Sequence, residues 1–135
     1  MGKLVVIVDN IPAVREALRE VVEGLFEGLL QSGELAVEAL PDGPSLLARS
    51  SQRVPDLVFL DVDMPDLDGI DTFYRLKELV PAAAAGVFFL TGLAGAPTTN
   101  QRLEQAVLDG AGGFMSKPAT AAALEAVAER ILFGR

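Results

Sequence analysis

The sequence predicts a three-layer α/β domain, built as a doubly wound (βα)5 fold around a five-stranded parallel sheet. Five short apolar runs alternate along the chain with five helix-like segments, and this alternation is typical of α/β domains with right-handed crossovers. Most of the runs lack polar alternation, which favours strands that are buried on both faces of a parallel sheet. The length of 135 residues fits a single domain, residues 1–135, with a core of its own.

The predicted strands are short runs in which Val, Ile, Leu and Phe predominate, the residue types that favour strands. Their lengths match those of strands in globular proteins. The runs are Leu4–Val8, Leu35–Leu40, Leu57–Leu60, Val87–Leu90 and Gly113–Ser116.

The first helix is predicted as one continuous element from Pro12 to Leu30. Proline suits the first turn of a helix, where its missing N–H has no partner to lose. Apolar residues recur at helical spacing and form one face. They are Val14, Leu18, Val21, Val22, Leu25, Phe26 and Leu29.

Four further helices follow the later strands. The third stops before Pro81, and Gly110 suits the end of the fourth. The fourth has a thin apolar face, whereas the segment Ala82–Ala85 is predicted to be an exposed turn or a frayed helix end. The four helices lie near Pro44–Gln52, Ile70–Leu79, Thr98–Asp109 and Thr120–Phe133.

Composition excludes several classes of function. The net charge is −8 and no basic patch is visible, which argues against direct nucleic-acid binding. The chain has no cysteine and no histidine, so thiol catalysis, histidine catalysis and zinc–thiolate sites are excluded, and any metal must be a hard cation on oxygen ligands. The first apolar run is too short for a signal peptide, and no run reaches the roughly 20 residues needed to cross a bilayer. We therefore expect a cytoplasmic protein without a membrane partner.

Four polar residues stand where predicted strands end. Asp9 and Asp61 follow the first and third runs, Thr91 follows the fourth, and Lys117 follows the fifth. Ligand sites of open α/β sheets lie at the carboxyl ends of the strands. Two acids, a hydroxyl and an amine at that edge indicate a site that holds a cation and an oxyanion together.

These motifs resemble the receiver domain of two-component response regulators. Four of them occur in the order of that family, each after a predicted strand, and the resemblance covers essentially the whole chain. It implies a flavodoxin-like fold with strand order 2-1-3-4-5. The motifs are Val8–Pro12, Leu60–Pro65 with Asp68-Gly69, Phe89–Gly92 and Phe114–Pro118.

The resemblance implies that Asp61 is the phosphoacceptor in a phosphorelay, and that the phosphoryl group comes from a histidine kinase or a histidine phosphotransfer protein. It also implies a Mg²⁺ site made of Asp9, Asn10, Asp61 and the backbone carbonyl of Asp63. A divalent cation is needed because a carboxylate attacks an anionic phosphoryl group poorly unless charge is neutralised.

Three further residues receive roles from the resemblance. Lys117 supplies a second positive charge, and the following Lys117–Pro118 bond is expected to be cis. Thr91 is the switch hydroxyl that binds a phosphoryl oxygen after transfer, and Phe114 is the aromatic switch that fills the space behind it. These residues couple the site to a face made by the fourth helix, fifth strand and fifth helix, through which a downstream protein or a second copy of the chain would bind.

Two residues depart from the usual pattern of the family. Asn10 stands where a second acid is usual, and because an amide brings no charge we expect weaker Mg²⁺ binding. Asn10 is also a good helix N-cap, which is its alternative role. Phe114 stands where Tyr is frequent, and its alternative role is ordinary core packing. Leu93 and Asp63 are expected to flank the path of a hydrolytic water and to slow hydrolysis of the phosphorylated form.

The leading interpretation is a phosphoacceptor signalling domain rather than an enzyme. A degenerate receiver that binds partners without phosphorylation is the alternative, and Asn10 is its support. A haloacid-dehalogenase-type phosphatase is a third candidate, because Asp61-Val62-Asp63 satisfies its Asp-x-Asp motif. In that family the motif follows an early strand and an acidic pair comes later, and neither condition is met here. A flavin-binding flavodoxin is topologically possible, but no hydroxyl-rich phosphate loop follows the first strand.

Overall fold

Five parallel strands form one sheet in the order β2-β1-β3-β4-β5, as the sequence predicts. The computed structural model describes residues 2–92 and 96–135. Each predicted strand is confirmed to within one residue at either end. The strands are β1 (Lys3–Val8), β2 (Leu35–Leu40), β3 (Leu57–Asp61), β4 (Val87–Thr91) and β5 (Gly113–Ser116).

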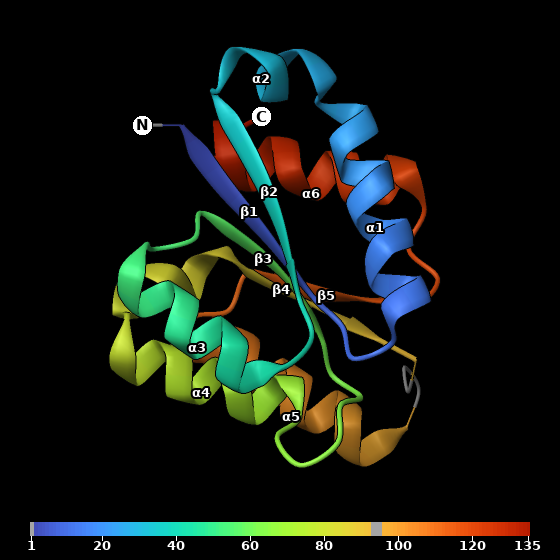
Figure 1. The fold of residues 1–135 in the computed structure, drawn as a ribbon. Helices are drawn as coiled ribbons and strands as arrows, with labels where there is room; N and C mark the ends of the chain where they lie inside the picture. The colour runs from blue at the N-terminus through green and yellow to red at the C-terminus, as the bar shows by residue number, and fades with distance from the viewer. Residues whose placement is uncertain (1, 93–95) are drawn as a thin grey trace.

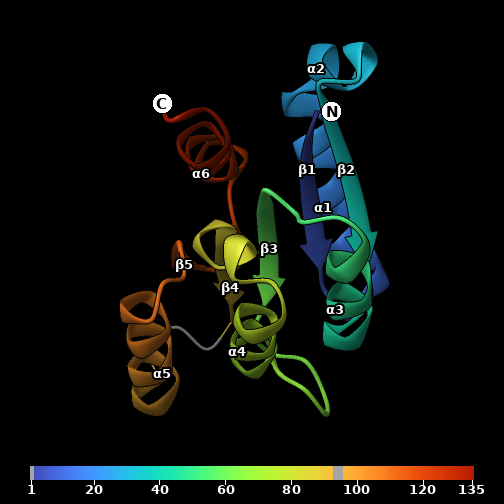
Figure 2. The same ribbon diagram turned by 90° about the vertical axis from the view of Figure 1, so that its left-hand side faces the viewer.

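Helices cover both faces of the sheet, which confirms the three-layer, doubly wound architecture (Figures 1 and 2). One face is covered by α1 (Pro12–Leu25) and α6 (Ala121–Phe133). The other face is covered by α3 (Gly43–Gln52), α4 (Gly69–Leu79) and α5 (Pro97–Leu108). A short helix, α2 (Glu27–Ser32), leads into β2. Within the described residues, no helix has the length and apolar character that a membrane span requires.

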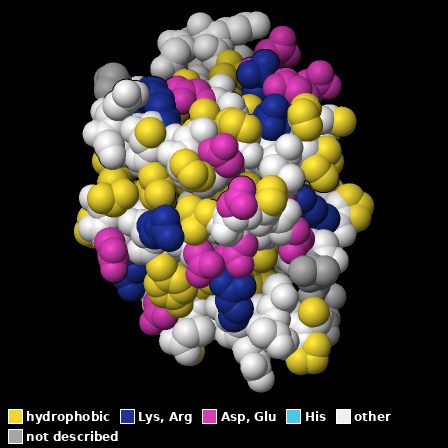
Figure 3. Space-filling model, turned by 60° about the horizontal axis from the view of Figure 1, so that its bottom comes forward, with side chains coloured by type: hydrophobic (Ala, Val, Ile, Leu, Met, Phe, Trp, Pro, Cys, Tyr) yellow, Lys and Arg dark blue, Asp and Glu magenta, His cyan; other side chains and the backbone are white. Residues whose placement is uncertain are grey.

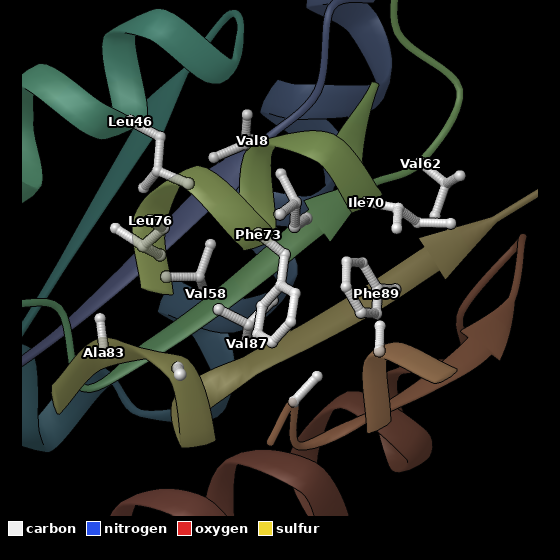
Figure 4. Close-up of a cluster of buried hydrophobic side chains, with 14 of the residues drawn as sticks. Val8, Leu46, Val58, Val62, Ile70, Phe73, Leu76, Ala83, Val87 and Phe89 are labelled. Carbon is white, nitrogen blue, oxygen red and sulfur yellow. The ribbon is translucent and has the colours of Figure 1, made fainter. Parts of the chain in front are cut away.

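The larger of two apolar clusters fills the space between the sheet and the layer of α3, α4 and α5. Figure 4 shows its centre, where Phe73 of α4 faces the side chains of β3 and β4. The rings of Phe73 and Phe89 pack edge to face with centroids 5.6 Å apart, a geometry that aromatic pairs prefer. This packing fixes α4 on the sheet, and α4 is the helix that follows the turn after Asp61.

The prediction of one continuous first helix is wrong, because the helix ends at Leu25 and a new helix begins at Glu27. Phe26 leaves the helical region, with φ −125° and ψ 32°. Its buried ring packs against Phe133 of α6, with ring centroids 6.3 Å apart. Gly24 and Gly28 flank the break, and glycine weakens a helix. The helical spacing continues across the break, so the pattern alone does not reveal it.

The prediction of an exposed turn at Ala82–Ala85 is also wrong. Residues Pro81–Gly86 form a 3₁₀ helix, η1, in which Ala83 and Ala84 are buried in the larger cluster. The small residues permit a close approach: a Cβ placed on Gly86 would overlap the carbonyl of Asp56.

Candidate functional site

The four polar residues predicted at strand ends meet at the carboxyl edge of the sheet. Asp61 and Thr91 are the last residues of β3 and β4, while Asp9 and Lys117 directly follow β1 and β5. Because these four strands are neighbours in the sheet, their ends lie together. Asp9, Asp61 and Thr91 are 0%, 1% and 0% exposed. In Figure 3, which brings this lower side of Figure 1 forward, acidic and basic side chains lie side by side.

Lys117 bridges the two buried acids. Its Nζ lies 2.9 Å from Oδ2 of Asp9 and 2.8 Å from Oδ1 of Asp61. Its backbone N–H donates to the carbonyl of Thr91 at 2.8 Å, which fixes the turn after β5 to the end of β4. The Lys117–Pro118 bond is cis, as expected from the resemblance. The amine therefore reaches across the sheet edge and joins strands that are more than 50 residues apart in sequence.

The charges of this triad perturb one another. Burial raises the pKa of the Asp61 carboxyl above its usual range, and the negative charge of Asp9 acts in the same direction, against the opposing effect of Lys117. For Lys117, burial acts to lower the pKa, but the hydrogen bonds to Asp61 and Asp9 together with their negative charges outweigh it and the pKa rises. Lys117 is thus held as a cation beside a carboxylate that is costly to ionise.

The turn after Asp61 is held by backbone contacts. The N–H of Asp63 donates to Oδ1 of Asp61 at 3.2 Å, and the N–H of Gly69 donates to the carbonyl of Val62 at 3.1 Å. Asp68 caps α4, because its Oδ1 accepts the N–H of Asp71 at 2.8 Å. The turn of residues 61–69, named the phosphoacceptor turn after its predicted role, therefore starts at a buried strand end and ends at a capped helix.

Asn10 does not cap the first helix. The N-cap of α1 is Ile11, and no side chain makes a capping hydrogen bond there. The Oδ1 atom of Asn10 is buried and, within the described residues, has no hydrogen-bond partner. Oδ1 of Asp9 instead accepts the N–H of Ile11 at 2.9 Å. The alternative role of Asn10 as a cap is therefore wrong, and its amide oxygen remains available to a cation.

These donors fit a hard cation. Two buried carboxylates lie at one edge of the sheet, the next residue in sequence after Asp9 carries a buried amide oxygen without a partner among the described residues, and Mg²⁺ prefers oxygen ligands. In the part of the chain that is described, no three acidic side chains group into a metal site. A cation here would depend on Asp9, Asp61, the amide of Asn10 and a backbone carbonyl, for which that of Asp63 remains the prediction.

The remaining predicted residues lie around the same edge. Oδ2 of Asp63, an exposed residue, accepts the N–H of Gly92 at 3.0 Å and links the turns after β3 and β4. Phe114 of β5 is half-buried against the larger apolar cluster. The switch roles of Thr91 and Phe114 stay predictions. Leu93 lies outside the described residues.

One group of residues near the site was not predicted from the sequence. Arg102 of α5 pairs with Asp68 and Asp71 of the α4 start, at 2.8 and 3.2 Å. The capping role of Asp68 has a sequence signal, since an Asp directly before a helical run is a good N-cap. The pairing with Arg102 has none, because the two residues are 34 positions apart and their contact depends on how α4 and α5 pack.

Comparison with known proteins agrees with this geometry. Residues 5–129 match the model of the response regulator receiver domain family. The chain is 32% identical over 118 residues to the chemotaxis protein CheY of Halobacterium salinarum, which covers 87% of each protein. It is 33% identical over 119 residues to the response regulator PleD of Caulobacter vibrioides, covering 87% of this chain but only 23% of PleD.

The fold recurs in solved structures. The receiver domain of a sensor histidine kinase from Pseudomonas aeruginosa, solved with a magnesium ion in its active-site cleft, superposes with a TM-score of 0.74 at 19% identity, and the match covers 98% of both chains. From the sheet order, the strand-end residues and the family match together, the chain belongs to the response regulator receiver domain family.

Proposed function

We propose that residues 1–135 form one receiver domain of a two-component system, which accepts a phosphoryl group on Asp61 and signals by a change of conformation. The observation that carries the proposal is the buried Asp61 carboxylate bridged to Asp9 by Lys117. Its donor is a histidine kinase or a histidine phosphotransfer protein, and its setting is the cytoplasm.

The contacts of Asp61 indicate which oxygen reacts. Lys117 and the N–H of Asp63 both contact Oδ1. Within the described residues, both of these contacts fall on Oδ1 and neither falls on Oδ2. We infer that a lone pair of Oδ2 attacks phosphorus while the P–N bond of the donor phosphohistidine breaks, and the released imidazole takes up a proton. Lys117 remains on Oδ1 and offsets the negative charge that gathers on the phosphoryl oxygens.

Mg²⁺, when bound, would neutralise charge on the carboxylates and the phosphoryl group. The side chains of Asp9, Asn10 and Asp61 and the carbonyl of Asp63 would hold it. The magnesium ion in the Pseudomonas receiver supports this proposal, as does the buried, unpartnered oxygen of Asn10.

Asn10→Asp is expected to tighten Mg²⁺ binding about tenfold, because a charged ligand replaces a neutral one at a partly buried position, and a tenfold gain corresponds to about 1.4 kcal/mol. A Mg²⁺ titration of both proteins measures this. Asn100→Asp, which adds the same charge on α5, is the control and should leave the affinity unchanged within about twofold. Equal affinities for the wild type and Asn10→Asp would mean that Asn10 is not a ligand.

The phosphohistidine donor is proposed to dock beside α1. A groove with a cavity volume of about 550 Å³ runs between α1 and the turn after β5, and Lys117 lines it. Its α1 wall includes the small, exposed Ala13 and Ala17, which leave room for a helix of the donor. Since Lys117 belongs to both the groove and the site, a histidine carried on that helix would be brought to Asp61.

Ala17→Glu is expected to slow transfer from a histidine-phosphorylated protein at least about tenfold, because a charge would be buried in an apolar contact. Transfer from acetyl phosphate should be unchanged, since that donor needs no groove. Ala122→Glu, at an exposed position of α6, is the matched control. If the two donors slow equally in Ala17→Glu, the docking surface is misplaced.

The signal is proposed to leave through Thr91 and Phe114 toward the face of α5, β5 and α6, where a downstream protein or a second copy of the chain binds. Thr91 would turn toward the phosphoryl group and Phe114 would fill the space behind it. Phe114 can supply packing there but no hydroxyl.

Incubation with acetyl phosphate and Mg²⁺, followed by intact-mass measurement and a phosphate-release assay, separates the candidate functions. A receiver gains one phosphoryl group that persists and then decays. A degenerate receiver gains none. A phosphatase releases phosphate in many turnovers without lasting label, and that result would replace the proposed function.

A further inference from the structure

Helix α5 is held by little apolar packing. Of its twelve residues only Leu103 and Ala106 are buried, and Leu108 at its end is 80% exposed. The neighbouring helix α4 buries Ile70, Phe73 and Leu76 in the larger cluster. A helix with so few buried contacts depends on its polar contacts for its position.

Arg102 makes such a contact at the N-terminal half of α5. Its Nη1 donates to Oδ2 of Asp68 at 2.8 Å, and its Nη2 lies 3.4 Å from Oδ1 of Asp68 and 3.2 Å from Oδ1 of Asp71. This two-pronged geometry is the strong form of an arginine–carboxylate pair. Burial acts to raise the pKa of Asp68, but the hydrogen bond and charge of Arg102, together with backbone N–H donors at the start of α4, outweigh it and the pKa falls.

Asp68 is in turn joined to the phosphoacceptor. It caps α4, and the next residue, Gly69, lies directly on the backbone of Asp61: a Cβ placed on Gly69 would overlap the Asp61 carbonyl oxygen and lie 2.9 Å from its carbonyl carbon. The contacts therefore run without a gap from the Asp61 backbone through Gly69 and Asp68 to Arg102.

A second attachment holds the far end of α5. The hydroxyl of Tyr74 donates to Oδ2 of Asp109 at 2.6 Å, and Lys77 donates to the Asp109 carbonyl. Burial and this carboxylate raise the pKa of Tyr74 to about 12. Asp109 lies two helical turns beyond Arg102, about 10 Å along the axis. With that end fixed, loss of the Arg102 contact frees the N-terminal half of α5, which is the half nearest to Thr91 in sequence.

We propose that Arg102 is a positioning residue: through Asp68 it ties α5 to the phosphoacceptor turn and holds both in the resting arrangement, so that the switch to the phosphorylated arrangement must break this pair. The inference rests on the proposed function, because only a phosphorylated Asp61 gives the chain a second arrangement to switch to. The two-pronged pair itself, and its path to the Asp61 backbone, stand independently of it.

Arg102→Gln and Asp68→Asn, singly and together, test the inference. Asn keeps an oxygen for the cap of α4 while removing the charge. Partly exposed ion pairs contribute up to about 1 kcal/mol, so each single variant should speed amide hydrogen exchange in α5 about two- to fivefold. The double variant should add nothing to Arg102→Gln, because that single change already removes the pair with Asp68. Arg135→Gln, which removes the remote pair with Glu129, should leave exchange in α5 unchanged.

The second readout is the affinity for beryllofluoride with Mg²⁺, a mimic of the phosphoryl group. If the pair holds the resting arrangement, both single variants should bind the mimic about two- to fivefold more tightly, since the competent arrangement is then more populated. Faster exchange in α5 without tighter binding of the mimic would show that Arg102 has only a structural role, and this would overturn the inference. Unchanged exchange in α5, or additive effects of the two single variants, would also overturn it. If the mimic binds none of the proteins, the proposed function fails. The exchange measurement remains informative in that case: faster exchange in α5 means that Arg102 holds that helix, and unchanged exchange means that it does not.

Discussion

Asp61→Asn is expected to abolish phosphorylation and, in metal-free buffer, to make the folded protein more stable at neutral pH. Labelling is lost because an amide oxygen is a far weaker nucleophile than a carboxylate oxygen. Stability rises because the wild-type chain must keep a buried carboxylate ionised beside Asp9, whereas Asn pays no such desolvation cost. The Asp61 carboxylate thus supplies the proposed nucleophile and lowers the stability of the folded protein.

The sign of the pH dependence follows from the raised pKa of Asp61. A carboxyl whose pKa is raised in the folded state favours folding while it is protonated, and this contribution is lost as the pH rises through the raised value. The wild type and Asp61→Asn should therefore be closest in stability below pH 3.8, the ordinary pKa of the group, and should diverge above it. Urea unfolding at several pH values with a chelator present measures the difference. A variant less stable than the wild type at neutral pH would contradict the account of the site.

Gly69→Ala is expected to destabilise the fold by about 2–3 kcal/mol and to impair phosphorylation of the protein that remains folded. A Cβ at this position would overlap the Asp61 carbonyl oxygen and approach Cα of Val62 to 2.9 Å. These neighbours are backbone atoms between a buried strand and a capped helix, so they cannot move aside as a flexible side chain would. For a domain whose total stability is about 5–15 kcal/mol, the loss is large.

Gly28→Ala is the matched control for this substitution. Gly28 is exposed in α2, and a Cβ there would have no heavy atom within 4 Å among the neighbours considered. Because alanine favours a helix more than glycine does, the control should gain about 0.5–1 kcal/mol. Urea unfolding of both variants gives the two changes. Equal effects for Gly69→Ala and Gly28→Ala would show that the turn tolerates a side chain and is not packed as described.

The strands could be predicted closely because their signal is local. Runs such as Leu57–Leu60 are apolar on both faces, and the central strands of the sheet are buried on both faces. The break at Phe26 could not be predicted, because it goes with a contact to Phe133, more than 100 residues away in the sequence. The burial of Ala83 likewise depends on how η1 packs against the chain before β3.

The site was predictable where strand ends determine it. Asp9, Asp61, Thr91 and Lys117 each stand at or directly after a strand, and the order of a parallel sheet brings them together. Side-chain contacts between neighbouring helices could not be predicted from the sequence. The contact of Arg102 with Asp68 requires the packing of α5 on α4.

The unused oxygen of Asn10 is a third feature that the sequence does not reveal. Its state depends on which residue caps α1, and the sequence offers Asn10 as a good cap, whereas the structure has Ile11 at that position. Capping preferences rank residue types at a known position, but they do not fix where the first helical residue falls.

The most direct test of the central claim is to locate the phosphoryl group. The protein is incubated with acetyl phosphate and Mg²⁺, the acyl phosphate is reduced with borohydride, and the peptides are mapped by mass spectrometry. A single modified residue, Asp61, is expected, with Asp9 and Asp63 unmodified. Modification at another carboxylate, or stable acceptance of a phosphoryl group by Asp61→Asn, would contradict the central claim.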